Sequence, residues 1–574
     1  MLAPHWRKKI IRTIRTHKWE AVALAVILCI GIFLRTYHFS DWLHFEIDQA
    51  YDFNTVSPAL TDGIGHLPLV GPNVGGGLLR LGPAFYYMEY LSTLVFGNTP
   101  AGHAGATLVL SLLSLPLFYV FTKRYFSVTE SLGLLAIFST SLFSVLYSRF
   151  SWSPNVLPFL MLLSSYALLR AVSPKERHPA QWFLLAVTVV TVTSQIHLNS
   201  FFTAPLIAVL FIAIKRPKFH WKVWLAAAGI ILVVSSPLIV NHLRDHGENL
   251  HLLRVKLEKT GPRIAPPLQT AAETIVYDAY EYFFIVTGID EINGMKLSGY
   301  GFSCGDCEEQ LPVKSSAILL FTVAGILFLR AFFRERDTDR RNFLLLAGLW
   351  FLVSFALFYT VAQGYRMYPR FFLIVSPLAV LWFGFLLHDF MSDRTRTRSV
   401  IYATIILVLI SSNIRRIIPV FDQLANVPTE TDATAPTGDI FPDTDRVTLG
   451  ELGTVAGYVA TRSRESGYPT YLSAKSEFVL PFWTILNPLG IRYHADITDK
   501  TLFTEGNYFD IKFSGARPND DPKFTVTETR NFGMLTVYTL TPRPEFIVAD
   551  RQSPNDRKDL MEMKVLSKLH TWDE

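Results

Sequence analysis

Three carboxylates stand close together directly after the first long apolar run of the chain. They are Glu46, Asp48 and Asp52, and aromatic residues lie between them. A carboxylate beside a lipid bilayer is costly to bury, so acids in this position are candidates for chemistry. If the segment is helical, Asp48 and Asp52 share a face and Glu46 lies elsewhere. A solvated acid cluster that caps a helix fits the same pattern.

Cationic and aromatic side chains stand in short links between apolar runs. Each arginine by itself can extend toward lipid headgroups, and the histidine can cap a helix end. Their recurrence at one interface favours a binding layer instead. Cations could hold a phosphate and stabilise it as a leaving group, while a carboxylate takes the proton of an attacking hydroxyl. The candidates for phosphate or substrate binding are Arg80, Arg149, His197, Tyr365, Arg366 and Arg370.

The composition is that of a membrane protein. Half of the 574 residues are hydrophobic and only 18% are charged, which is less charge than a soluble protein of this length carries. The net charge of +5 is spread as short basic clusters between apolar runs. That distribution is typical of topology signals and argues against nucleic acid as a partner.

Eleven apolar runs are expected to cross the membrane, and the first is expected to be a retained anchor. The basic residues of the N-terminus place it in the cytoplasm. The segment 82–96 is expected to lie in the interface, because a crossing there would put the later basic clusters outside. The runs lie near 21–34, 101–122, 131–147, 154–172, 180–196, 200–214, 222–241, 314–333, 342–362, 370–390 and 399–418.

This topology predicts three regions. Residues 1–19 form a cytoplasmic N-terminus, and residues 20–419 form the membrane domain with external loops at 37–100 and 242–313. Residues 420–574 are polar and predict an extracytoplasmic α/β domain. Within it we expect a helix at Leu449–Glu465, strands at Pro469–Ala474 and Tyr508–Phe513, and a hairpin that turns at Arg530–Gly533.

Two of the three cysteines, Cys304 and Cys307, form a CxxC pair in the second external loop. Outside the cytoplasm such a pair is most often a local disulfide. A zinc site needs two more ligands, and the sequence has no second CxxC pair. We therefore expect no metal site and no cofactor, although the sequence leaves a divalent metal possible.

Four motifs occur along the membrane domain. They are the acids Glu46-Ile-Asp48, the interfacial Gly82-Pro83-Ala-Phe-Tyr86-Tyr87, the span Ala101–Arg124 with its basic end, and Ser153-Pro154-Asn155. Their order and spacing resemble those of the GT-C fold glycosyltransferases that use lipid phosphosugars. That group includes the protein O-mannosyltransferases of glycosyltransferase family 39 and the lipid A aminoarabinose transferases. The resemblance covers roughly residues 20–390.

The resemblance implies roles for some of these residues. Asp48 would be the general base, with Glu46 as the alternative. Arg80 would approximate the basic residue that binds donor phosphate, although Leu81 and Gly82 depart from the family's Pro-Pro pattern. Many relatives have an acid where this chain has Asn155, which argues against a scheme with two carboxylates or a metal.

The sequence thus predicts an all-α polytopic membrane protein of GT-C type with a C-terminal soluble α/β domain. Its expected activity is an inverting transfer of a sugar from a polyprenyl-phosphate donor to a hydroxyl on a lipid, glycan or protein, at the outer face of the plasma membrane. The alternatives are a transporter or flippase of lipid-linked sugars and a non-catalytic membrane assembly protein. For each of these three candidate functions we expect membrane lipids as partners.

Overall fold

The computed structural model describes residues 18–74, 79–258, 267–289, 296–298, 301–303, 307–362, 367–390, 395–425, 447–495, 497, 502–518, 521–547 and 571. The chain divides into two compact units. Unit 1 comprises Met1–Tyr37, Leu69–Met88 and Ala106–Ile417, and unit 2 comprises His38–Pro68, Glu89–Gly105 and Ile418–Glu574.

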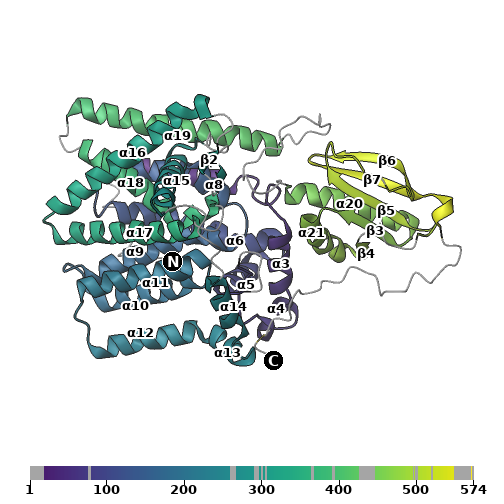
Figure 1. Ribbon diagram of the computed structural model, residues 1–574, viewed down its shortest axis with the longest axis horizontal. Helices are drawn as coiled ribbons and strands as arrows, with labels where there is room; N and C mark the ends of the chain where they lie inside the picture. Colours follow the sequence, from purple (N-terminus) through teal and green to yellow (C-terminus); the bar gives the residue numbers. More distant parts are fainter. Residues whose placement is uncertain are drawn as a thin grey trace. The chain divides into compact units, whose positions relative to one another are not determined.

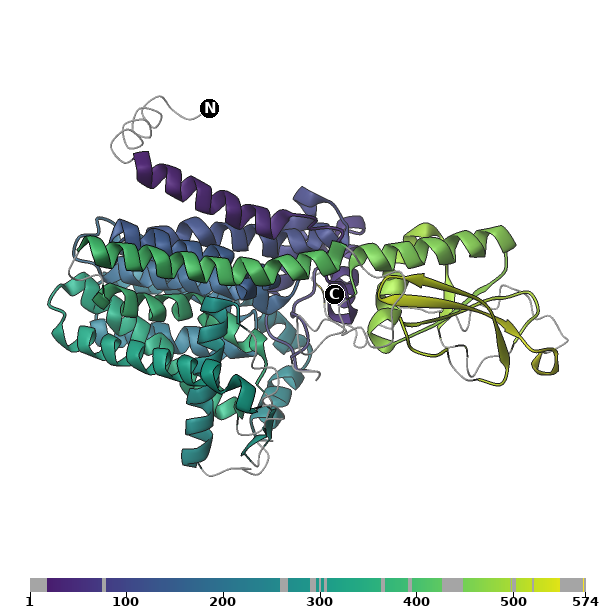
Figure 2. The same cartoon turned by 90° about the horizontal axis from the view of Figure 1, so that it is seen from above.

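Unit 1 is built from helices. Figures 1 and 2 show α9, α10, α11, α12 and α17 lying side by side with their axes aligned. The long helices that lie wholly or partly in this unit are α2 (Lys18–Thr36), α6 (Pro100–Thr122), α7 (Val128–Thr140), α9 (Leu157–Val172), α10 (Pro179–Ser194), α11 (Leu198–Lys215), α12 (Trp221–Val234), α15 (Pro267–Thr287), α16 (Cys307–Arg334), α17 (Thr338–Ala362), α18 (Ser376–Phe390) and α19 (Arg396–Ala425). Shorter elements connect them: α8 (Leu142–Tyr147), η2 (Ser153–Val156), α13 (Ser236–Arg244), α14 (Glu248–Glu258), the strands β1 (Lys296–Ser298) and β2 (Gly301–Ser303), and η3 (Pro369–Val375).

The eleven predicted membrane runs coincide with helices of the described chain. Eight helices there are long and apolar enough to cross a bilayer, and α12 with α13, which are bent by 52° at their junction, form either a broken span or a re-entrant loop. The remaining two runs correspond to the shorter apolar helices α7 and α10. The prediction of a polytopic helical membrane domain is therefore confirmed, while its orientation in the membrane stays a prediction.

The expected interfacial segment forms α5 (Ala84–Phe96), a helix of 13 residues. At 1.5 Å per residue it is about 20 Å long, which is shorter than the hydrocarbon core of a bilayer. Its first turn is buried through Phe85 and Tyr86. Its place in the interface stays a prediction.

Buried polar side chains bind helix ends inside unit 1. The last carbonyls of a helix have no partner within that helix, so a buried helix end needs donors from elsewhere. Arg35 donates to the carbonyl of Ser139 in the last turn of α7 at 2.7 Å. Asn413 donates to the carbonyl of Val286 at the end of α15 and accepts the amide of Leu142 at the start of α8. These side chains join helices that are distant in sequence.

Unit 2 contains a five-stranded sheet with strand order β4-β3-β5-β7-β6. Strand β3 pairs in parallel with β4 and β5, whereas β7 pairs in antiparallel orientation with β5 and β6. The strands are β3 (Thr470–Ala474), β4 (Tyr493–Ala495), β5 (Asn507–Phe513), β6 (Phe524–Phe532) and β7 (Leu535–Pro542). The remaining elements that lie wholly in unit 2 are α3 (Ile47–Val56), α4 (Pro58–Thr61), η1 (Ile64–His66), α20 (Leu449–Ser466), α21 (Ser476–Leu486), η4 (Asn487–Leu489) and η5 (Pro544–Phe546).

The local signals of the tail explain its elements. Thr448 caps α20 and shares a capping box with Glu451, and the helix ends at Gly467, whose φ of 68° suits glycine. The predicted hairpin turns at Gly533 with φ of 66°. The predicted α/β character of the tail is confirmed.

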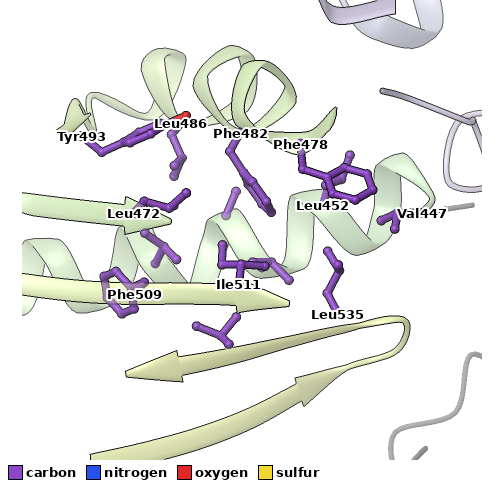
Figure 3. Packing of buried hydrophobic residues seen from close by; sticks show 14 of the residues in the cluster. Val447, Leu452, Leu472, Phe478, Phe482, Leu486, Tyr493, Phe509, Ile511 and Leu535 are labelled. Carbon is purple, nitrogen blue, oxygen red and sulfur yellow. The ribbon is translucent and has the colours of Figure 1, made fainter. Parts of the chain in front are cut away.

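The core of unit 2 lies between the sheet and the helices α20 and α21. Figure 3 shows Phe478 and Phe482 of α21 pointing toward Leu452 of α20 and toward Ile511 on β5. Phe45 belongs to the same buried cluster, as does Ala50 of α3. A segment from the first external loop therefore completes the core of the C-terminal sheet domain.

Phe482 tests this core, because its side chain is fully buried. Phe482→Ala should lower stability by about 3–5 kcal/mol and the thermal midpoint of unit 2 by on the order of 10 °C. The matched control is Phe546→Ala, since Phe546 is 39% exposed. Calorimetry of the full chain in detergent checks the difference, and equal midpoints for the two variants would contradict the described core.

Candidate functional site

The predicted acids lie at the start of α3 in unit 2. Glu46 is the residue that precedes the helix, and its amide donates to the side-chain oxygen of Gln49 at 3.0 Å. Asp48 stands in the first turn, where the helix dipole favours a carboxylate. The segment is therefore helical from Ile47, which is the condition under which Asp48 and Asp52 share a face.

The acids of this segment differ in exposure. Asp48 is exposed, whereas Glu46 and Asp52 are buried. The Glu46 carboxylate lies 3.7 Å from Nε2 of His44, which is also buried. Asp48 is thus the carboxylate that solvent or a substrate hydroxyl reaches most readily. The catalytic roles of Asp48 and Glu46 stay predictions.

Arg149 is engaged by the protein backbone of unit 1. It is almost fully buried, and its guanidinium donates to the carbonyls of Leu34 at 2.9 Å and Tyr37 at 2.6 Å. These carbonyls lie at and just beyond the end of α2, so Arg149 satisfies a helix terminus. A structural role explains this geometry, and a role in substrate binding stays a prediction.

Arg80 lies in a loop that a neighbouring helix holds by its backbone. Asn249 of α14 accepts the amide of Arg80 at 2.9 Å and donates to its carbonyl at 2.8 Å. The guanidinium of Arg80 donates to the carbonyl of Gly71 at 3.0 Å. The sequence offered no signal for Asn249, because this clamp joins residues 169 positions apart.

Arg370, by contrast, is surrounded by aromatic rings. Its guanidinium carbon lies 4.4 Å from the ring centre of Tyr368, 5.1 Å from Trp152 and 5.5 Å from Phe371. Such contacts stabilise a cation without consuming its N–H groups. Within the described part of the chain, the Arg370 guanidinium makes no hydrogen bond or ion pair.

Four links between helices meet in unit 1. Arg370 contacts Trp152 across two of these links, and the ring of His197 lies 6.1 Å from Phe371. The segment that follows Arg80 lies against the link that carries Gln195 and His197. A Cβ at Gly82 would lie only 2.2 Å from the side-chain oxygen of Gln195. A larger residue at position 82 would therefore require the Gln195 side chain to move. His197 also caps α11, since its Nδ1 accepts the amide of Asn199.

Some predicted residues lie outside the described residues. These are Tyr365, Arg366 and Cys304, while Cys307 begins α16 without a described side chain. Among the residues that the structure describes, no group of three or more His, Cys, Asp or Glu side chains is arranged to hold a metal ion. The disulfide and the metal independence both stay predictions.

Asp278 is a buried acid that the sequence reasoning missed. It lies in α15, which is not among the candidate membrane spans of the described chain, and it is 2% exposed. Its Oδ1 has no hydrogen-bond partner among the described residues, and burial raises the pKa of its carboxyl well above the usual range. The signal was present in the sequence, because Asp278 interrupts the largely apolar and aromatic stretch 275–287.

Comparisons with known proteins find similarity in structure only. No protein-family model and no curated protein matches the chain. The crystal structure of ArnT from Cupriavidus metallidurans bound to undecaprenyl phosphate has 12% identity and a TM-score of 0.48, and the match covers 93% of this chain and 99% of ArnT. The apo form of ArnT has 11% identity and a TM-score of 0.49, with 93% and 100% covered.

A mutant of the arabinofuranosyltransferase AftD from mycobacteria, solved by cryo-electron microscopy, is also similar. It has 12% identity and a TM-score of 0.40, and the match covers 91% of this chain and 41% of AftD.

The raised pKa of Asp278 predicts a pH dependence of stability. The folded state holds a proton that the unfolded chain releases near pH 4, so stability falls as pH rises from there toward the folded pKa. Asp278→Asn removes this titration. The variant should melt at a higher temperature than the parent at pH 8, and the difference should shrink at pH 5.

Thermal midpoints in detergent at the two pH values check this expectation. Glu248→Gln serves as the control, because Glu248 is an exposed acid of unit 1. A gap between Asp278→Asn and the parent that stays constant with pH would rule out titration of Asp278 as its cause.

Proposed function

We propose that the protein is an integral membrane glycosyltransferase of GT-C type. It transfers a sugar from a polyprenyl-phosphate donor to a hydroxyl acceptor at the outer face of the plasma membrane. The N-terminus is cytoplasmic and the C-terminal domain extracytoplasmic in this proposal. The observation that carries it is the state of Arg370, a guanidinium enclosed by aromatic rings where four links of unit 1 meet.

Arg370 suits the recognition of a phosphate. A guanidinium presents five N–H groups in a planar fork that binds two phosphate oxygens at once. The rings of Tyr368 and Trp152 hold the cation in a half-buried position, where screening by water is reduced. The same rings offer apolar surface to a sugar ring or to the first isoprene unit of the lipid.

The other arginines support this site in different ways. Arg149 donates to the carbonyls of Leu34 and Tyr37 at and just beyond the end of α2, and these bonds fix the link that carries Trp152. The loop of Arg80 is held by Asn249, so its guanidinium is presented from an ordered backbone. Arg370 is therefore the first candidate for the donor phosphate, and Arg80 is the second.

Asp48 is proposed as the general base. Its carboxylate takes the proton of the acceptor hydroxyl, and the hydroxyl oxygen attacks the anomeric carbon of the donor sugar. The bond from that carbon to the phosphate oxygen breaks, and its electron pair leaves with the polyprenyl phosphate. Cations stabilise the phosphate that is released. Attack from the face opposite the phosphate inverts the configuration. Glu46 remains the alternative base.

Asp48→Asn tests the chemical step, because an amide cannot take the proton. Purified protein in lipid nanodiscs would be given a panel of polyprenyl-phosphate sugars with membrane extract as acceptor. Sugar transfer should fall by at least about 100-fold, which is the lower range for loss of a general base. Binding of undecaprenyl phosphate, measured by native mass spectrometry, should remain within about twofold of the parent.

The control for this variant is Asp41→Asn, because Asp41 is likewise an exposed acid and lies in the segment before α3. It should keep parental transfer. If the parent moves lipid-linked sugar across vesicles without any acceptor, the protein is a transporter. If neither the parent nor the variants transfer sugar with any donor of the panel, the enzyme assignment fails.

Arg370→Ala and Arg149→Ala separate binding from folding. Loss of a charge-assisted contact costs about 1.5–3 kcal/mol, so Arg370→Ala should weaken undecaprenyl phosphate binding by roughly 10- to 100-fold. Its thermal midpoint should change little. Arg149→Ala should instead lower the midpoint, because two helix-end carbonyls lose their donor.

Titration with the lipid and a melting curve for each variant provide the two readouts. Parental affinity in Arg370→Ala would remove this residue from the phosphate site.

A further inference from the structure

The helix that carries Asp48 is part of the core of unit 2. Phe45 and Ala50 are 1% and 0% exposed, and they share a buried cluster with α20, α21 and the sheet. A helix of ten residues is too short to be stable by itself in water. The position of α3 therefore depends on the residues that pack against it.

The C-terminal sheet domain binds the segment before α3 through its backbone. His44 pairs with Thr448 in an antiparallel bridge, and the amide of Leu449 donates to the carbonyl of Leu43 at 2.8 Å. Thr448 is also the residue that caps α20. The start of α20 thus fixes the chain directly before Glu46.

A side-chain hydrogen bond joins α3 to α21. The side-chain amide of Asn54 donates to the hydroxyl of Thr484 at 2.6 Å and to the carbonyl of Ala50 at 2.7 Å. Thr484 is 5% exposed, and its hydroxyl donates to the carbonyl of Leu480. The buried hydroxyl thus both accepts and donates, so the pair specifies one register of α3 on α21.

The opposite flank of α3 is also held within unit 2. The ring of Phe53 lies 4.6 Å from that of His103, whose Nε2 is 3.1 Å from the side-chain oxygen of Asn98. Ser57 donates to the same oxygen at 3.0 Å. The helix α3 is thereby held from both sides.

We propose that Thr484 and Asn54 are positioning residues for the reaction. Through them the C-terminal domain holds α3 in the register that presents Asp48 to the acceptor hydroxyl. The domain is then a part of the catalytic machinery and not a separate module. This inference rests on the proposed function and assigns a purpose to the C-terminal domain within it.

Thr484→Val tests the contact, because it removes the hydroxyl and nearly keeps the shape. If the bond positions Asp48 only for the chemical step, its loss raises the activation barrier by about 1 kcal/mol, and kcat should fall about fivefold. The donor KM and the binding of undecaprenyl phosphate should stay at the parental value. Thr484→Ser restores the hydroxyl and should recover most of kcat. Rates are expressed per mole of lipid-binding sites, so that unfolded protein does not count.

The matched control is Thr461→Val, since Thr461 bonds its own helix carbonyl in α20 and is exposed. The loss of kcat in Asn54→Ala combined with Thr484→Val should be no more than the larger of the two single losses, because both substitutions remove the same Asn54–Thr484 bond.

Three outcomes would overturn the proposal in a parent enzyme that transfers sugar and depends on Asp48. They are parental kcat in Thr484→Val, equal losses in Thr484→Val and Thr484→Ser, or additive losses in the double variant. A parent that transfers no sugar would instead count against the proposed function.

Discussion

Unsatisfied backbone carbonyls at helix ends impose the main constraint on unit 1. A carbonyl that ends a helix inside an apolar bundle finds no water and must receive a donor from another element. Arg35 supplies the end of α7, Arg149 supplies the end of α2, and Asn413 supplies the end of α15. The helices are thus joined to each other by polar side chains at defined positions.

This constraint also separates the cations by task. An arginine at a membrane interface can donate to the carbonyls of a helix end or to an anionic ligand. A given N–H group binds only one of these acceptors at a time. Arg149 is engaged by carbonyls, whereas Arg370 is stabilised by ring faces, and no described residue accepts a hydrogen bond from its N–H groups. Both contribute to one region of unit 1, since Arg149 orders the link from which Trp152 reaches Arg370.

Local patterns in the sequence predicted much of the fold. Apolar runs identify the helices of unit 1, and the periodicity of Leu449–Glu465 and the turn signal at Arg530–Gly533 predicted α20 and the hairpin of unit 2. The sequence did not decide whether the segment after Glu46 is helical, and the structure places it in α3. What the sequence could not reveal are pairings between distant residues, such as Asn249 with Arg80 and Asn54 with Thr484. The sequence also could not distinguish an arginine that donates to backbone carbonyls from an arginine that packs against aromatic rings.

The contact between α3 and α21 joins residues that are 430 positions apart. At a ribosomal rate of about 5–20 residues per second, α21 is synthesised roughly 20–90 s after α3. During that interval Phe45 and Ala50 lack the partners that bury them. The nascent chain therefore completes the packing of its acid-bearing helix only after the C-terminal sheet domain has been synthesised, and a chain truncated before α20 never completes it.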